Sequence, residues 1–165
     1  MRVLGIDPGT VTMGYGVVDD KDEALTAPAY GAIVAPARSP IGERLLFMYN
    51  HLLDIIAHHQ PDVLAIEQPF FAKNARSALA IGRSQSVAIL AAAGRGIPVY
   101  EYTPAQVKQQ VSNYGASSKE QVQEMIKLQL GLATIPEPDD AADALAVALC
   151  HLSENRLANL LSGRG

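Results

Sequence analysis

The sequence contains one cysteine and no tryptophan, and it has no long apolar stretch. The single cysteine, Cys150, excludes an internal disulfide bond and fits the reducing conditions of a cytoplasm. A transmembrane helix needs about 20 consecutive apolar residues, and no segment approaches that length. Residues 1–5 lead directly into a predicted strand, which leaves no room for a signal peptide. We therefore expect a cytoplasmic protein without a membrane span.

An excess of positive charge is also missing, because the formal net charge is −4. Domains that bind nucleic acids are usually basic, so this value argues weakly against a DNA ligand. The argument is weak because a cluster of metal-binding carboxylates would itself lower the net charge. Basic side chains are found in the middle of the chain, at Lys73, Arg76, Arg83, Lys108, Lys119 and Lys127. A solvated surface would explain most of them equally well.

What is present is the composition of one well-packed domain. The chain has 165 residues, of which 48% are hydrophobic and 18% are charged. A domain of this length buries about 70% of the surface of its unfolded chain. No repeat, low-complexity tract or linker divides it. We expect residues 1–155 to form a single domain and residues 156–165 to form a flexible tail.

Hydrophobic periodicity predicts strands first and then alternating helices and strands. The expected strands are residues 3–7, 14–18, 30–35, 63–67 and 98–102, and the expected helices are residues 41–59, 75–95, 104–112, 118–130 and 139–153. Ser117 or Ser118 is the expected N-cap of the fourth helix. This order of elements predicts an α/β domain with a mixed central sheet.

Four acidic residues stand where such a fold could bring them together. Asp7 and Glu67 each end a buried apolar strand, and ligand sites of α/β sheets lie at the carboxyl ends of strands. Asp140 and Asp143 are three residues apart in a predicted helix and share a face. Clustered carboxylate oxygens are the ligands that Mg²⁺ and Mn²⁺ prefer. The sequence therefore predicts a divalent metal site.

Each acid could instead act alone. Asp7 could cap the turn that follows it, and Asp139 or Asp140 could cap the last helix. Asp139 also shares a helix face with Asp143, since the two are four residues apart. Spacing alone therefore does not decide whether Asp139 or Asp140 belongs to the site.

Four segments of the sequence resemble the RuvC family of bacterial Holliday-junction resolvases. They read GIDPGT…GYGVV over residues 5–18, AIEQPFFAKNARSAL over residues 65–79, YTPAQVKQQV over residues 102–111 and DAADALAVA over residues 140–148. The resemblance implies a ribonuclease-H-like fold, with a mixed five-stranded central sheet flanked by helices. It also implies a homodimer that uses Mg²⁺, two ions per active site with Mn²⁺ as a substitute. The implied reaction is a pair of symmetric nicks in a four-way DNA junction, leaving 5′ phosphates and 3′ hydroxyls, in recombination and DNA repair.

The resemblance also assigns roles to individual residues. It makes Asp7, Glu67, Asp140 and Asp143 the metal-binding catalytic acids, leaves Asp139 as a helix cap, and gives Lys119 a part in catalysis and DNA binding. It implies DNA contacts for Phe70 and Lys108. From the residues themselves, we expect one ring of Phe70 and Phe71 to pack inward and the other to face DNA, where it could stack on a base. The neighbouring Lys73, Asn74 and Arg76 are further candidate DNA contacts. The RuvA–RuvB branch-migration complex is the implied partner.

The sequence departs from the family pattern at two places. Pro69 stands where the family commonly has a small β-branched residue. Residues 82–86 read GRSQS, where the family usually reads GQARG. The helix predicted over residues 75–95 contains this second departure, and it is the best candidate for a dimer interface, although a helix buried within one subunit would have a similar sequence.

Three other functions remain open from the residues. The segment DPGT at residues 7–10 also resembles the phosphate-binding hairpin of actin-like ATPases, although such proteins usually have two lobes. A ribonuclease-H-like nuclease acting on RNA or single-stranded ends is a second alternative. A protein that binds junctions without cutting them is the third, and that class would be expected to lack catalytic acids.

Overall fold

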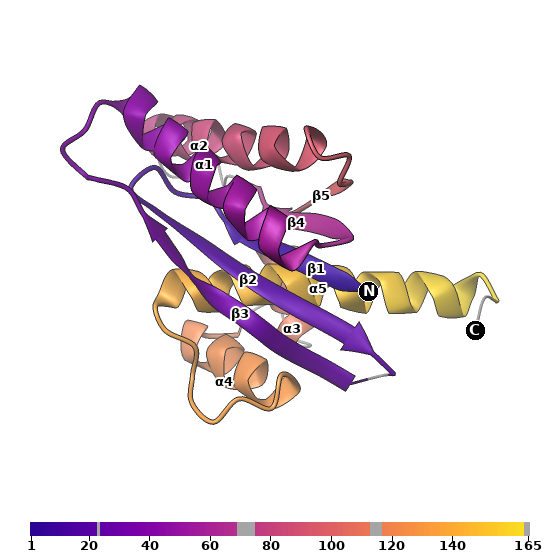
Figure 1. The fold of residues 1–165 in the computed structure, drawn as a ribbon. Helices are drawn as coiled ribbons and strands as arrows, with labels where there is room; N and C mark the ends of the chain where they lie inside the picture. The colour runs from indigo at the N-terminus through magenta and orange to yellow at the C-terminus, as the bar shows by residue number, and fades with distance from the viewer. Residues whose placement is uncertain (23, 69–74, 113–116, 164–165) are drawn as a thin grey trace.

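The computed structural model describes residues 1–22, 24–68, 75–112 and 117–163 as a five-stranded sheet with five helices (Figure 1). The strands are β1 (Arg2–Asp7), β2 (Thr12–Lys21), β3 (Ala24–Val34), β4 (Val63–Glu67) and β5 (Val99–Tyr102). The helices are α1 (Ile41–His59), α2 (Ala75–Ala93), α3 (Pro104–Ser112), α4 (Lys119–Gln129) and α5 (Asp139–Leu161). The predicted α/β class is therefore confirmed.

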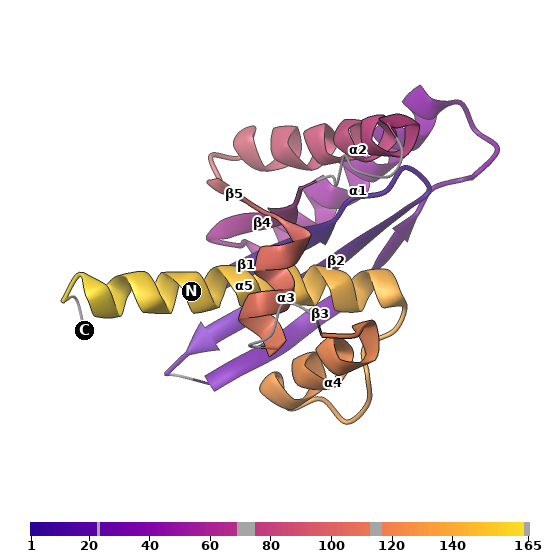
Figure 2. The ribbon, with the colours of Figure 1, turned by 180° about the vertical axis from the view of Figure 1, so that it is seen from behind.

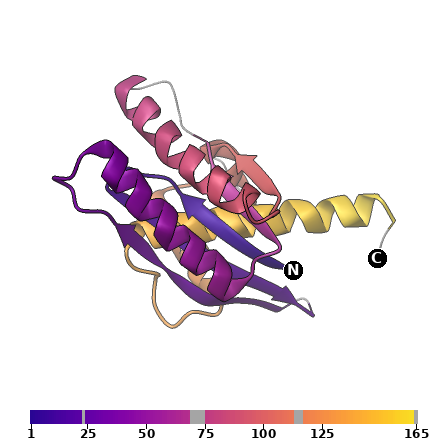
Figure 3. The same ribbon diagram turned by 45° about the horizontal axis from the view of Figure 1, so that its top comes forward.

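The sheet is mixed, as expected. Its strand order is β3-β2-β1-β4-β5. The pairs β1–β2 and β2–β3 are antiparallel, whereas β1–β4 and β4–β5 are parallel. Helices α1 and α2 lie side by side over one face (Figure 3). Helix α5 crosses the other face, with α3 and α4 packed beyond it (Figure 2).

Alternation along the strands separates two hydrophobic cores, one on each face of the sheet. In β1, Leu4 and Ile6 point toward α1 and α2, whereas Val3 points toward α5. In β4, Leu64 and Ile66 face α1 and α2 in the same way, whereas Val63 and Ala65 face α5. Because successive side chains of a strand point to opposite faces, Asp7 and Glu67 are directed to the α5 side.

The hairpin of β2 and β3 is longer than predicted, and ion pairs explain the difference. The Arg2 guanidinium binds Asp19 with its Nε 2.6 Å from Oδ1, and the Arg156 guanidinium binds Asp20 at 2.7 Å. These two aspartates belong to a polar stretch that the sequence pattern assigns to a turn. Pairing with arginine allows them to extend β2 to Lys21.

The last helix also differs from the expectation. We predicted an end near Ser153 and a flexible tail over residues 156–165, but α5 continues to Leu161. The bond from Arg156 to Asp20 anchors this extension to the hairpin. None of the described helices is long and apolar enough to cross a membrane.

Candidate active site

The carboxyl ends of β1 and β4 bring Asp7 and Glu67 to adjacent positions of the sheet. The two strands are parallel, and the last register pair before these acids is Ile6 with Ile66. Each acid therefore follows the last pair of the β1–β4 ladder and points to the same face. The apolar runs before them are almost completely buried. This placement agrees with the sequence-based prediction for both residues.

Glycines bring α5 into direct contact with the backbone of β1 and β2. A Cβ atom at Gly14 would overlap the main-chain oxygen of Asp140, and one at Gly5 would overlap the main-chain oxygen of Ala144. Gly14 is also the register partner of Asp7 across the β1–β2 ladder. The absence of side chains at these positions thus sets the first turn of α5 beside Asp7. The hydrophobic pattern does not predict this role, although glycines at alternate positions of a strand (Gly14 and Gly16) are a signal for it in the sequence.

Burial and mutual repulsion raise the pKa values of three of the acids. For Asp7, burial and the charges of Asp143, Glu67 and Asp140 raise the pKa to about 8. For Glu67, burial and the charge of Asp143 raise the pKa to about 7. Burial also raises the pKa of Asp143, against the opposing effect of Lys119. Because Asp7 interacts with all three other acids, the structure gathers the four predicted acids in one electrostatic cluster.

Lys119 places a positive charge at the edge of this cluster. Its Nζ lies 3.1 Å from Oδ2 of Asp139 and 3.3 Å from Oδ2 of Asp143. These hydrogen-bonded carboxylates raise the pKa of Lys119, although partial burial acts in the opposite direction. The lysine, which begins α4, is thereby held beside the acids of α5.

Asp139 is not the helix cap that the family resemblance implies. Pro138 occupies the N-cap position of α5 and makes no side-chain capping bond. Asp139 instead accepts hydrogen bonds from Lys119 and from Gln123 Nε2 at 3.0 Å, and these bonds lower its pKa. The prediction of a cap is wrong because the donors to Asp139 come from α4, and the local sequence around residue 139 does not reveal them. The N-cap predicted for α4 is confirmed at Ser118, which forms a capping box with Gln121.

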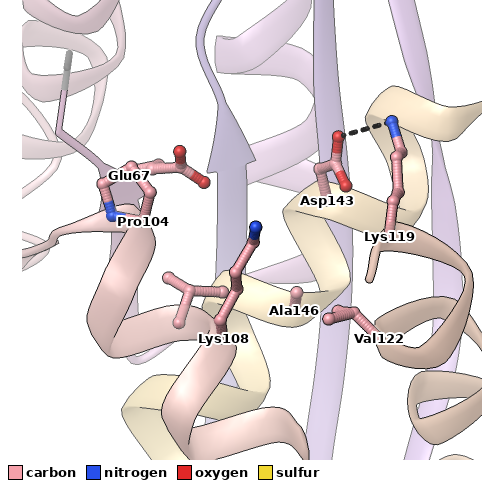
Figure 4. Close-up of a pocket in the computed structure, with 8 residues that line it drawn as sticks. Glu67, Pro104, Lys108, Lys119, Val122, Asp143 and Ala146 are labelled. Atoms are coloured by element: carbon pink, nitrogen blue, oxygen red, sulfur yellow. Dashed lines mark hydrogen bonds and ion pairs between the residues drawn. The ribbon is translucent and has the colours of Figure 1, made fainter. Parts of the chain in front are cut away.

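A cavity of about 210 Å³ opens beside the acids (Figure 4). Glu67 and Asp143 lie on opposite sides of it, and Lys108 of α3 extends between them (Figure 4). Apolar side chains form the rest of its wall, at Pro104, Val107, Val122 and Ala146. A charged and partly apolar cavity of this kind strengthens electrostatic interactions with any bound phosphate.

The donor set fits a hard divalent cation. All four gathered side chains are carboxylates, which is the ligand type for Mg²⁺ or Mn²⁺. As they stand, no three His, Cys, Asp or Glu side chains within the described ranges are close enough together to enclose an ion. Burial, together with repulsion from the neighbouring carboxylates, raises the pKa values of Asp7 and Glu67, and a bound cation would favour their anionic forms.

Several predicted DNA contacts cannot be placed beside this site. Phe70, Phe71, Lys73 and Asn74 lie outside the described residues, as does Pro69. Arg76 lies in the exposed first turn of α2. The contacts predicted for these residues therefore stay predictions.

Comparison with known proteins identifies relatives along nearly the whole chain. Residues 3–151 match the family described as Crossover junction endodeoxyribonuclease RuvC. The protein of that name from Chloroflexus aggregans is 56% identical over 151 residues, which cover 92% of each chain. The one from Dehalococcoides mccartyi is 52% identical over 162 residues, which cover 98% of each chain.

Solved structures agree with this assignment. Thermus thermophilus RuvC in complex with a Holliday junction substrate has a TM-score of 0.91 and 34% sequence identity, with 96% of each chain covered. The yeast mitochondrial Holliday junction resolvase has a TM-score of 0.69 over 99% of this chain and 83% of its own, at 15% identity, which supports the shared fold alone. The expected ribonuclease-H-like fold is confirmed. From its fold and its relatives, this chain belongs to the RuvC family of crossover junction endodeoxyribonucleases.

Proposed function

We propose that this protein resolves four-way DNA junctions by metal-dependent hydrolysis at the carboxylate cluster of β1, β4 and α5. Family membership supports a metal-dependent nuclease. The observation that carries the assignment of the site is the electrostatic cluster of four acids, two of which, Glu67 and Asp143, line one cavity together with Lys108 and Lys119. The products would be 5′ phosphates and 3′ hydroxyls, which a ligase can join.

Asp7, Glu67, Asp140 and Asp143 would hold two divalent ions, Mg²⁺ or its substitute Mn²⁺. When bound, such ions lower the pKa of a water molecule and stabilise the charge of the scissile phosphate and the leaving oxygen. Asp7 is the natural shared ligand, because its charge interacts with those of all three other acids. Asp7 ends β1, whose four central residues are buried.

The two lysines would act on the DNA. Lys108 lines the cavity that Glu67 and Asp143 border, so its ammonium group can reach a phosphate placed there. Lys119 is bound to Asp143 and Asp139 at the edge of the same cavity. We assign Lys119 to charge stabilisation at the reacting phosphate and Lys108 to a backbone contact.

The proposed assembly is a homodimer, because two symmetric nicks need two active sites related by a two-fold axis. The buried side of α2 packs on its own subunit through Ala78, Ala88 and Ala91, whereas Leu79 and Leu90 of the same helix are more than half exposed. We propose that this exposed side of α2 contributes to the dimer.

The setting of this activity follows from its substrate. Junction DNA arises during recombination and repair, and we propose that the protein acts on it in the cytoplasm together with a RuvA–RuvB complex. The complex of the Thermus thermophilus relative with a Holliday junction supports junction DNA as the substrate.

The decisive experiment uses a labelled synthetic four-way junction and a linear duplex of the same sequence, each with Mg²⁺. We expect the wild type to make paired symmetric nicks in the junction only. Asp7→Asn and Glu67→Gln should bind the junction without cutting it. Glu124→Gln is the matched control, because Glu124 pairs with Lys127 at 3.6 Å on α4 and lines no part of the cavity.

Two results would contradict the proposal. A wild type that binds the junction but does not cut it with Mg²⁺ or Mn²⁺ would indicate a binding protein. Cutting by Asp7→Asn at the wild-type rate would show that the carboxylate cluster is not the active site.

A further inference from the structure

Two consecutive polar residues of α2 are buried on the side that faces the sheet. Ser84 is completely buried and Gln85 is 8% exposed. The hydroxyl of Ser84 donates to the main-chain oxygen of Gly9 at 2.7 Å. The side-chain amide of Gln85 donates to Oε2 of Glu101 at 2.8 Å. Buried polar groups of this kind are costly unless they are paired, so these bonds have a structural purpose.

Both acceptors lie next to strand ends that carry catalytic acids. Gly9 is two residues after Asp7, in the turn that joins β1 to β2. Glu101 precedes Tyr102, which is the register partner of Glu67 in the β4–β5 pair. Helix α2 packs on the face of the sheet opposite α5. From the other side of the sheet, the Ser84 bond therefore reaches the backbone of the turn after Asp7, and the Gln85 bond reaches the side chain of Glu101 on β5.

The turn after Asp7 has little freedom to adjust by itself. A Cβ atom at Gly9 would overlap the main-chain oxygen of Thr12, so the backbone is already tightly folded there. The other neighbour of the Ser84 hydroxyl is the sulfur of Met48 at 3.9 Å, which is a weak acceptor. The Ser84 hydroxyl therefore donates its proton to the main-chain oxygen of Gly9, and this bond ties the orientation of the β1–β2 turn to α2.

We propose that Ser84 is a positioning residue of the metal site, which fixes the β1–β2 turn and through it Asp7, with Gln85 fixing the β5 side next to Glu67. The inference rests on the proposed metal-dependent function of the cluster. The arrangement also links the site to the helix that we assign to the dimer interface.

The test compares Ser84→Ala with Ser86→Ala. Ser86 is an exposed residue of the same helix whose hydroxyl donates to Gly82 within α2 at 2.8 Å, so it is a matched control. Ser84→Ala removes only a hydroxyl group and places a strong helix former in α2, so the variant should fold. The readouts are Mn²⁺ binding to the protein alone by titration calorimetry, the thermal midpoint, and junction affinity without metal.

We expect Ser84→Ala to weaken Mn²⁺ binding by between about two- and tenfold, the range that one buried hydrogen bond provides. Ser86→Ala should bind Mn²⁺ like the wild type, and both variants should keep wild-type junction affinity. A Ser84→Ala protein with a lower thermal midpoint but unchanged Mn²⁺ affinity would overturn the proposal, since the bond would then be structural only.

Failure of the proposed function would be seen separately. A wild type that binds Mn²⁺ and cuts no junction would refute the nuclease assignment but leave the calorimetric comparison of the two serines valid. A wild type that binds no Mn²⁺ would refute both.

Discussion

Asp7→Asn should make the metal-free protein more stable at alkaline pH, although it should abolish cutting. Burial and three neighbouring carboxylates raise the pKa of Asp7 from 3.8 to about 8. Between these two pH values the folded state retains a proton that the unfolded state releases. The free energy of unfolding therefore falls as the pH rises from about 4 to about 8. Asparagine has nearly the same shape but no charge, so it removes this loss.

The size of the effect follows from the pKa difference. At about 1.4 kcal/mol per pH unit, full ionisation of Asp7 costs at most about 6 kcal/mol. Local relaxation and water entry reduce this upper bound, and we expect a gain of about 2–4 kcal/mol for Asp7→Asn at pH 8.5. For a chain of this size that gain corresponds to a rise of roughly 5–15 °C in the thermal midpoint.

The assay is thermal unfolding in a chelator at a series of pH values from 4 to 8.5, with Asp139→Asn as control. The Asp139 side chain is 69% exposed and bonded to Lys119, so removing its charge should give no gain in stability. The difference between Asp7→Asn and the wild type should vanish near pH 4. Excess Mg²⁺ should raise the midpoint of the wild type more than that of Asp7→Asn. An Asp7→Asn protein that is no more stable than the wild type at pH 8.5 would refute the electrostatic reasoning.

Two further predictions concern packing. Gly14→Ala should lower the unfolding free energy by about 1–3 kcal/mol and abolish cutting while leaving junction binding detectable, because the added methyl displaces Asp140. The control is Gly42→Ala, in open space on α1, which should be neutral or stabilising. Equal activity of the two variants would contradict the role of Gly14. Tyr102→Phe should lower the unfolding free energy by about 1–2 kcal/mol in urea titrations, because the Tyr102 hydroxyl lies 2.7 Å from Nδ1 of buried His151. An unchanged urea midpoint would show that this bond contributes nothing to stability.

The sequence could predict the acids because their signals are local. Asp7 and Glu67 each follow a short apolar run, and a charge at the end of a buried strand needs a partner. Asp140 and Asp143 are spaced for one helix face. The parallel pairing of β1 with β4, which the structure confirms, then brings the two strand ends together.

The sequence could not predict the features that depend on distant segments. The donors that bind Asp139, Lys119 and Gln123, come from another helix, so the local sequence around Asp139 does not reveal them. The extension of α5 past Ser153 depends on Arg156 meeting Asp20, which is 136 residues away in the chain. Likewise, no pattern around Ser84 indicates that its hydroxyl reaches Gly9, 75 residues earlier. Local sequence constrains the elements, whereas these contacts exist only after the elements have packed.

The length of helix α5 makes its far end a suitable place for a fluorescent label that measures distances to bound DNA. The helix has 23 residues, so its axis extends for roughly 34 Å from the carboxylate end to the end that projects beyond the sheet (Figure 2). Cys150 is buried, and its burial, with the nearby Glu154, raises its thiol pKa to about 12, so it should not react with maleimide dyes. Ser162→Cys, exposed just past the helix, would therefore accept a single fluorophore far from the acids. A labelled junction could then report its distance from that dye, while the end of the helix that carries Asp140 and Asp143 stays chemically unmodified.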